Sequence, residues 1–410
     1  MREKPEITRR AFLVASGAGI AAEAMHRRAC AARGVTPSMP IRVGVIGCGQ
    51  QGRKHLRGLR RLEESGKNIE IAAASDVYVP ALESARALTG CRTYHHWRDL
   101  LEHPGLDAVI IAAPDHWHAA MGAAAVQAGK DVFCETPMAL SKEEATAFRD
   151  AVRDSDRIVL FNVPEFFNPR WRAVQNFLRW GAAGPVRWIQ CNCGNSRGAT
   201  ASNADAADFM PNLLDWEGFL GPASSQPFSV DRFLGWRKYW DYSHGVCASL
   251  LFNHLAVILH ALGDVAPRLA SSTGGVFAHG KQETPDAVLS NIECAGGTTV
   301  VLVAGPSNSN APVTVIRGRD ACVDLRGDVL RVTPERQRTQ SAHPGRDTTA
   351  PTRTTEGKEE NILADKTLRH WIDAVRNRAA DGCNADIACH AQTALCMAMD
   401  AYRQTLAICA

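Results

Sequence analysis

The stretch Ile41–Arg60, IRVGVIGCGQQGRKHLRGLR, decides how the N-terminal part of this chain folds. Its apolar start predicts a buried strand, and three glycines then follow in the spacing G-x-G-x-x-G before a helical segment. Such a turn lets the backbone approach a pyrophosphate and directs the first amides of the helix toward it. The cofactor contacts expected at this turn are Gly47, Cys48, Gly49, Gln50, Gln51 and Gly52.

An acidic residue in the right place strengthens this interpretation. The next apolar segment, Ile69–Ser75, ends at Asp76, twenty-four residues beyond Gly52. A carboxylate at the tip of the second strand accepts hydrogen bonds from the adenosine ribose of NAD. The same carboxylate would repel the additional phosphate of NADP. We therefore expect NAD as the cofactor, with NADP less favoured.

Strands and helices alternate regularly from residue 38 to residue 163. Near-continuous apolar strands between amphipathic helices are typical of a parallel sheet covered on both faces, so we expect a doubly wound α/β domain here. Ser141 and Glu144 form a capping-box pattern for the last helix. The expected strands are 41–47, 69–75, 108–113, 131–134 and 157–163, and the expected helices are 51–64, 80–88, 118–128 and 142–154.

Two further segments follow successive strands of this domain. Right-handed crossovers place the C-terminal ends of all parallel strands on one edge, where a nucleotide binds. The residues after the third and fourth expected strands therefore become candidates for contact with the cofactor. They are Pro114, Asp115, His116, Trp117, His118, Glu135, Thr136 and Pro137.

The rhythm changes in residues 164–410, which predict a second domain of the α+β class. Alternating strands with few crossovers indicate an open, largely antiparallel sheet. Residues 334–360 are charged, rich in threonine and without periodicity, so we expect a mobile surface loop. The expected strands are 186–193, 271–278, 287–294, 298–303 and 313–316, and the expected helices are 171–180, 249–262, 361–379 and 388–408.

Composition indicates an ordinary globular protein rather than a binder of nucleic acid or membrane. Of its 410 residues, 45% are hydrophobic and 22% are charged, and the net charge is +3. We expect no membrane span, because no apolar run is long enough. The thirteen cysteines form no paired C-x-x-C half-sites, so we expect no metal site and interpret them as small buried hydrophobic residues.

The first 37 residues are interpreted as a leader. The segment Thr8–Leu13, TRRAFL, resembles a twin-arginine export signal, although threonine replaces the usual serine. A functional signal would engage the twin-arginine export machinery, which carries folded proteins, and would place the chain in the periplasm. The alternative is a disordered basic tail on a cytoplasmic protein, which the many unpaired cysteines would suit better.

After the leader, the chain resembles the Gfo/Idh/MocA family of nicotinamide-dependent oxidoreductases. The matching pieces are VGVIGCGQQGRKHL, SDVY, AAPDHWHA, AGKDVFCETPMALSKEEA, LDWEGFLGPA and WRKYWDYSHG. The resemblance implies a sugar, polyol or glycoside substrate bound between the two domains. It also implies that the second domain's helical segment faces the nicotinamide, and that the open sheet face can serve as a homo-oligomer interface.

The family's catalytic residues are replaced in this chain. The resemblance aligns the family's lysine with Thr136, its aspartate with Ser249 and its histidine with Asn253. Oxidation of a carbinol needs a base to take the hydroxyl proton, and none of these three side chains does so at neutral pH. The usual proton relay is therefore absent.

Four ionisable residues are candidates for the missing base: His254, His244, Glu165 and Tyr239. His254 lies on an apolar helical segment and could instead be a core histidine, whereas His244 lies in a loop. Tyr239 could pack in the core, and Glu165 could be a solvated acid. The expected substrate contacts are Arg237, Tyr239, His244, Asn253 and His254.

Three functions remain open at this point. The first is an NAD-dependent oxidoreductase with an altered proton-transfer set. The second is an NAD-dependent glycosidase, which the family also contains, in which transient oxidation of a ring hydroxyl acidifies the neighbouring C–H and allows elimination. That chemistry suits a tightly bound cofactor. The third is a non-catalytic, nucleotide-binding sugar sensor.

Overall fold

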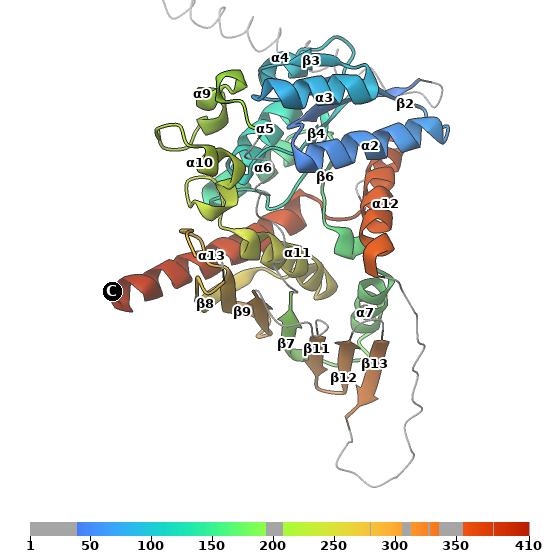
Figure 1. Ribbon diagram of the computed structural model, residues 1–410. Coiled ribbons are helices and arrows are strands. Elements are labelled where there is room, and N and C mark those ends of the chain that lie inside the picture. The colour runs from blue at the N-terminus through green and yellow to red at the C-terminus, as the bar shows by residue number, and fades with distance from the viewer. Residues whose placement is uncertain are drawn as a thin grey trace, which may run out of the picture.

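The computed structural model describes residues 39–193, 208–278, 280–305, 313–326, 329–335, 356–379 and 381–409. Two sheets, with helices packed on them and between them, make up this part of the chain (Figure 1). The predicted leader lies outside the described residues, as do residues 336–355 of the predicted mobile loop.

The first sheet confirms the doubly wound α/β prediction. Its order is β3-β2-β1-β4-β5-β6, and every neighbouring pair is parallel. The C-terminal ends of all six strands therefore lie on one edge of the sheet, here called the cofactor edge. The strands are β1 (Ile41–Ile46), β2 (Ile69–Ser75), β3 (Arg92–Tyr94), β4 (Ala108–Ile111), β5 (Asp131–Cys134) and β6 (Val159–Phe161).

The crossover helices cover both faces of this sheet. The predicted capping box at α6 is present, since the side chains of Ser141 and Glu144 each accept a hydrogen bond from the other residue's backbone N–H. The helices are α2 (Gln50–Glu64), α3 (Val79–Thr89), α4 (Trp97–Leu101), α5 (Asp115–Gln127) and α6 (Lys142–Arg153).

Three details of this domain differ from the prediction. Strand β3 and helix α4 were not expected, because they have three and five residues and are too short to show a period. Helix α5 begins at Asp115, not at His118, with Pro114 as its N-cap. An acid in the first turn favours this earlier start, because it interacts well with the positive end of the helix dipole.

A helix from the second half of the chain completes the first domain. Helix α12 (Glu356–Asn377) lies beside α2 (Figure 1), and its Trp371 is fully buried, stacked 5.4 Å from the ring of Phe133. An ion pair of 2.6 Å joins Arg61 to Asp365 at the same contact. The predicted loop 334–360 is wrong at its end, because residues 356–360 are helical; glutamate and lysine there are good helix formers.

The second sheet confirms the prediction of an open, largely antiparallel sheet. Its order is β13-β12-β11-β7-β10-β9-β8, and only the pair β7 and β10 is parallel. Strands β12 and β13 were not predicted. The strands are β7 (Val186–Asn192), β8 (Pro267–Gly275), β9 (Ala287–Cys294), β10 (Thr299–Ala304), β11 (Val313–Gly318), β12 (Ala321–Arg326) and β13 (Val329–Pro334).

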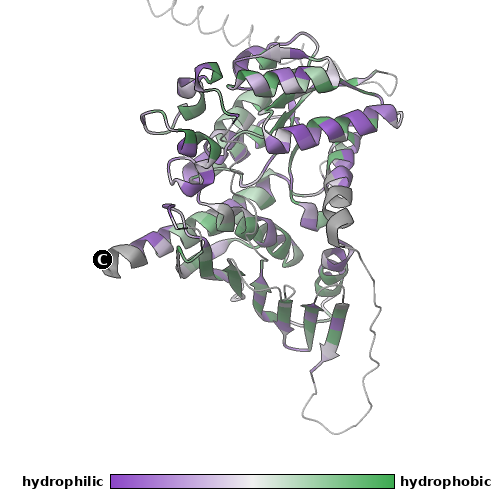
Figure 2. Ribbon diagram, in the orientation of Figure 1, coloured by the Kyte–Doolittle hydropathy of each residue, from purple (hydrophilic) through white to green (hydrophobic). Residues whose placement is uncertain are grey.

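Helices α11 and α13 lie between the second sheet and the first domain (Figure 1). Helix α11 is apolar on nearly all sides, which is typical of a helix enclosed in a core, and the strands beneath it are mostly hydrophobic (Figure 2). The remaining helices are η1 (Pro164–Phe167), α7 (Pro169–Arg179), η2 (Pro211–Leu213), α9 (Trp216–Leu220), α10 (Val230–Leu234), η3 (Trp236–Lys238), α11 (Val246–Ala261) and α13 (Ala385–Cys409).

The cysteines from Cys48 to Cys396 are all free and buried, which confirms their interpretation as small core residues. Within the described ranges, no set of three or more metal-binding side chains gathers around one point. The helices of the described ranges are likewise too short or too polar to cross a bilayer.

Candidate active site at the cofactor edge

The glycine turn after β1 has the geometry that a dinucleotide requires. Gly47 has φ of +87°, and a Cβ on Gly52 would lie 1.9 Å from the Gly47 carbonyl oxygen. These two glycines are therefore required by the fold itself. Gly49 differs, because it is exposed and a Cβ there would meet nothing within 4 Å. Space at Gly49 leaves the backbone open to a ligand.

The start of α2 and the end of β2 complete a site that fits the ADP part of a dinucleotide. Among the described residues, no side chain caps the first turn of α2, whose N-cap is Gly49. Its free amides suit an anion. The carboxylate of Asp76 accepts from the amide of Cys48 at 2.6 Å and from that of Tyr78 at 2.8 Å. Burial raises the pKa of Asp76, and these two bonds oppose the shift.

Glu135, directly after β5, is the centre of a polar cluster. Its Oε1 accepts from Gln51 Nε2 at 3.1 Å and from Asn162 Nδ2 at 2.8 Å, and it pairs with His55. Burial alone would raise the pKa of Glu135, but these donors and the charge of His55 lower it below its ordinary value. The cluster therefore holds the carboxylate of Glu135, an anion, where β5 meets the start of α2.

Two of the three positions that the resemblance aligns with the family's catalytic residues touch each other. The Thr136 hydroxyl donates to Asn253 Oδ1 at 2.9 Å, joining the cofactor edge to α11 of the second domain. Ser249, one turn earlier on α11, has a buried hydroxyl without a hydrogen-bond partner among the described residues. The structure therefore brings Thr136 and Asn253 together as a neutral pair, where the resemblance places the family's lysine and histidine.

Buried aromatic residues of the segment that follows β4 form hydrogen bonds that hold it in place. The ring nitrogens of His118 lie 2.6 Å from the Pro137 carbonyl and 2.8 Å from the Ala113 carbonyl. Trp117 Nε1 donates to the Phe219 carbonyl at 2.9 Å. These contacts tie the two edge segments to each other and to α9, which is a structural role. Whether these residues also contact the cofactor stays a prediction.

The start of α5 carries polar atoms without partners. Asp115 is buried, and its Oδ2 accepts from the Ser243 hydroxyl at 2.6 Å. Its Oδ1 and the Nδ1 of His116 are buried and have no hydrogen-bond partner among the described residues. Burial raises the pKa of Asp115 and lowers that of His116 to about 4. Buried polar atoms of this kind mark a place that a ligand can complete.

His254 lies on α11 beside two acidic groups. Its Nδ1 is 2.9 Å from the Leu250 carbonyl, a contact that an N–H makes, so Nε2 carries the lone pair of the neutral ring. Burial lowers the pKa of His254, but the charges of Cys191 and Glu165 outweigh it and raise the pKa above 6.5. Glu165 Oε2 is buried and has no partner among the described residues.

The other two candidate bases have less suitable surroundings. Tyr239 donates to Asp231 at 2.5 Å, and burial together with that carboxylate raises its pKa to about 12. His244 is half-buried, and burial and the charge of Arg403 lower its pKa to about 4. A tyrosine with this pKa stays protonated at neutral pH, and a histidine with this pKa is a weak base.

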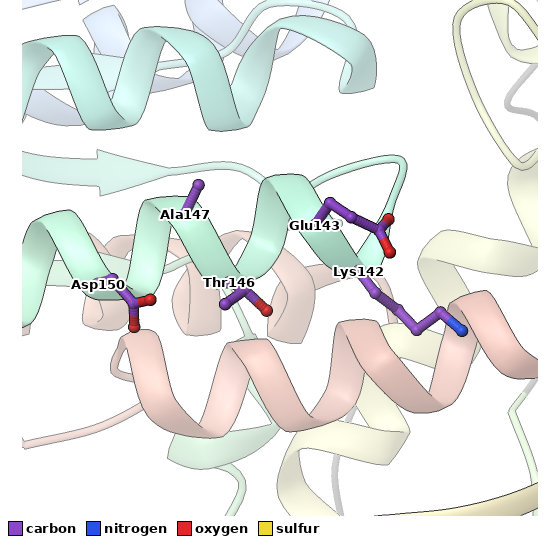
Figure 3. A pocket seen from close by; sticks show the side chains of 5 residues that line it. All are labelled: Lys142, Glu143, Thr146, Ala147 and Asp150. Carbon is purple, nitrogen blue, oxygen red and sulfur yellow. The ribbon is translucent and has the colours of Figure 1, made fainter.

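A separate hollow lies along α6 (Figure 3). Lys142, Glu143, Thr146, Ala147 and Asp150 line it, and all five belong to that one helix. It contains no residue of the glycine turn, of the Glu135 cluster or of α11. We therefore do not include it in the candidate site.

Three polar residues of this site were not predicted from the sequence: His55, Asn162 and Ser243. A signal was available for His55, because it lies four residues after Gln51 and therefore on the same face of α2. Asn162 and Ser243 bind Glu135 and Asp115 through contacts between distant parts of the chain, and no local pattern announces such contacts.

Comparison with known proteins agrees with this geometry. Residues 41–163 match the GFO_IDH_MocA family model, described as an oxidoreductase family with an NAD-binding Rossmann fold. Inositol 2-dehydrogenase 1 of Saccharopolyspora erythraea is 31% identical over 162 residues, which are 39% of this chain and 47% of that protein. A glycosyl hydrolase family 109 protein of Shewanella baltica is 29% identical over 163 residues, 37% of this chain and 35% of that protein.

The fold of both domains also has a solved counterpart. A levoglucosan dehydrogenase, in complex with NADH and levoglucosan, superimposes with a TM-score of 0.69 at 16% identity, covering 89% of this chain and 98% of that one. The matched part of this chain spans about half the length of the curated relatives, or less. The first domain is thus an NAD-binding Rossmann domain, and the likeness of the second domain is one of fold.

Proposed function

We propose that this chain, which belongs to the Gfo/Idh/MocA oxidoreductase family, is an NAD-dependent oxidoreductase that acts on a sugar, polyol or glycoside with an altered proton-transfer set. The observation that carries the proposal is the glycine turn, open at Gly49, beside the carboxylate of Asp76. The sugar and polyol dehydrogenases among the relatives support the substrate class.

The residues at the cofactor edge then divide the work. Bound NAD supplies the hydride acceptor. The α2 amides and Asp76 hold its ADP part, and Glu135 holds a negative charge at the end of β5, supported by three side-chain donors. Thr136 and Asn253 position the substrate by hydrogen bonds but move no proton at neutral pH.

His254 is our choice for the proton acceptor. Asn253, the residue before His254, contacts the cofactor edge. The Nδ1 of His254 is fixed by the Leu250 carbonyl, so its Nε2 carries the lone pair that accepts a proton in the neutral ring. Glu165 and Cys191 favour the protonated form that results and so strengthen the base. Neither Tyr239 nor His244 combines these properties.

The test uses the full purified chain. We expect an absorbance spectrum or calorimetry to reveal NAD binding, and a panel of sugars and polyols to produce NADH with at least one substrate. Loss of NADH formation in His254→Gln, with NAD affinity unchanged, would support the assigned base. A chain that binds no NAD at all would contradict the proposal.

A second candidate is an NAD-dependent glycosidase, which the similarity to a glycosyl hydrolase family 109 protein favours. Aryl glycosides distinguish the two functions, since a glycosidase releases the aryl alcohol without net NADH. Tight NAD binding with neither outcome across the panel would indicate the non-catalytic sugar sensor.

The open sheet face is proposed as a homo-oligomer interface. Leu269 on β8 and Leu289 on β9 are 62% and 41% exposed. Light scattering should report a dimer or larger assembly that Leu289→Lys weakens. Phe277→Lys is the control, because Phe277 lies beyond the end of β8. A monomer at all concentrations would refute the interface.

Export through the twin-arginine route is also a proposal. It rests on Arg9 and Arg10 in the leader. Residues 1–40 fused to a folded reporter should direct export, and replacement of both arginines by lysine should abolish it. A reporter retained in the cytoplasm with either leader would favour the disordered tail.

A further inference from the structure

A segment of the second domain reaches across to the first domain. Residues 209–243, here called the strap, contain η2, α9, α10 and η3. Helices α9 and α10 lie at the level of the first domain, apart from the second sheet (Figure 1). The strap also carries the expected substrate contacts Tyr239 and Arg237, and the guanidinium of Arg237 stacks on Trp236, 4.0 Å from the ring centroid. Its hydrogen bonds fasten it to the first domain at two places.

The first fastening point is the end of β2. The Asp215 amide donates to the Val77 carbonyl at 2.9 Å, and Leu214 pairs with Tyr78 in an antiparallel bridge. The side chain of Val77 also packs against the hydrophobic cluster of the strap. Val77 and Tyr78 are the two residues that directly follow Asp76. The strap is therefore bound next to the carboxylate that is expected to hold the adenosine ribose.

The second fastening point is the start of α5, after β4. Trp117 Nε1 donates to the Phe219 carbonyl at 2.9 Å, and the His116 amide donates to the Tyr242 carbonyl at 3.2 Å. The backbone of the strap comes close here, because a Cβ on Gly221 would lie 1.9 Å from the Trp117 ring. A glycine is thus required for the strap to seat on this tryptophan.

The sheet order shows what lies between the two fastening points. Strand β1 separates β2 from β4, so the ends of β2 and β4 are about 10 Å apart. Helix α9, which has five residues and is about 7.5 Å long, carries Asp215 as its N-cap and Phe219 near its other end. The helix therefore runs from the end of β2 to the end of β4 and crosses the end of β1. The glycine turn follows β1, and its Gly49 stays exposed.

We propose that the strap encloses the adenosine half of bound NAD, so that the cofactor leaves the protein only when the strap lifts from the first domain. The inference rests on the NAD binding of the proposed function and adds how the cofactor is retained. The contacts at the ends of β2 and β4 flank the expected adenosine position on both sides. When a lid must open before a ligand leaves, the opening slows dissociation.

The first test fixes the strap with a disulfide. Leu214 and Tyr78 lie opposite each other, and the Cβ atoms of such pairs are about 4.5–5.5 Å apart, close to the span of a disulfide. The full-length variant Tyr78→Cys/Leu214→Cys is loaded with NADH while reduced and is then oxidised. Excess NAD is added, and the loss of bound-NADH fluorescence gives the dissociation rate. We expect oxidation to slow dissociation by about tenfold or more, and a reductant to reverse the effect. Leu214→Cys alone is the control, because it cannot form the bridge.

The second test loosens the strap. Gly221→Ala places a Cβ in the Trp117 ring at a residue whose φ is +51°, so the strap must move away from α5. We expect NADH to dissociate about tenfold faster than from the unchanged chain. Gly66→Ala is the matched control, because Gly66 has φ of +81° but a Cβ there would meet nothing within 4 Å. It strains the backbone without touching the strap and should leave the rate unchanged.

The outcomes separate the strap from the reaction. NADH exchange that stays equally fast with the disulfide closed would overturn the proposal and leave the strap as a joint between the domains. An unchanged rate in Gly221→Ala, with a native circular dichroism spectrum, would also overturn it. Slow, disulfide-dependent release without NADH formation from any sugar or polyol would refute the oxidoreductase and support the strap. A chain that binds no NADH would refute both.

Discussion

The two ends of the cofactor edge treat the family pattern differently. Where β1 meets α2, the three glycines and Asp76 are all in place and have the geometry that a dinucleotide needs. Where β5 faces α11, Thr136 and Asn253 form a neutral pair in place of ionisable groups. Binding a nucleotide depends on backbone shape, whereas proton transfer depends on a titrating group in reach. The chain therefore keeps the backbone shape that binds a nucleotide. By our proposal, it carries out proton transfer with different residues.

The groups left without partners also differ between the two ends of the cofactor edge. Near the glycine turn, backbone amides are left for a ligand because no side chain in the described part of the chain caps α2. Near α11, the hydroxyl of Ser249 and a carboxylate oxygen of Glu165 are buried without partners among the described residues, next to a histidine. The first arrangement is ready to bind an anion, and the second can hold a proton. Four changes test this comparison.

The largest effect is expected for Gly52→Ala. Its Cβ would lie 1.9 Å from the Gly47 carbonyl oxygen, so the turn must open. We expect a loss of about 3 kcal/mol in the free energy of unfolding and loss of measurable NAD binding. Gly49→Ala is the matched control, because its Cβ has open space and should lower NAD affinity with little change in Tm. Equal destabilisation by both changes would show that the turn does not separate folding from binding.

The next largest effect is expected for Asp76→Ala. The change removes the acceptor of two backbone amides and the proposed ribose contact, so NAD affinity should fall by about 10- to 100-fold in a calorimetric titration. Asp107→Ala is the control, since Asp107 also accepts a backbone amide, that of Arg42 at 2.8 Å, but at the opposite edge of the sheet. Unchanged NAD affinity in Asp76→Ala would remove the assigned ribose contact.

An effect of similar size, but dependent on pH, is expected for His254→Gln. Oxidation needs the neutral ring, and the raised pKa of His254 means that kcat should increase as the pH rises through a value above 6.5. We expect the variant to lose this rise of kcat with pH. Its kcat should also fall by about 100-fold, with NAD affinity unchanged. His260→Gln, on the same helix and bonded to Asp264 at 2.8 Å, is the control. A pH profile that survives in His254→Gln would exclude His254 as the base.

The smallest effect is expected for Thr136→Val, which removes one hydroxyl and keeps the shape of the side chain. Asn253 loses its donor, so the free energy of unfolding should fall by about 1 kcal/mol. Because neither side chain titrates, kcat should stay within about threefold of the unchanged chain. A fall of several orders of magnitude in kcat would place the hydroxyl in the proton path and erase the difference between the two ends.

Much of the fold could be predicted because buried parallel strands are apolar along their whole length. This signal identified β1, β2, β4, β5 and β6, whereas β3 pairs with β2 through three residues and leaves no pattern. The charged start of α12 was mistaken for loop, since local charge does not reveal that a helix will pack on a distant sheet. Short elements and those formed by distant contacts were missed, and so were the six-residue strands β12 and β13.

The sequence by itself determined the nucleotide turn and the acid at the end of β2, because each depends on residue type at a short, fixed spacing. Only the tertiary structure decided which distant groups meet. Glu135 binds His55 across 80 positions, and Thr136 binds Asn253 across 117. These contacts arise when α2 and α11 pack against the cofactor edge, and that packing is set by the burial of whole helix faces rather than by any local pattern.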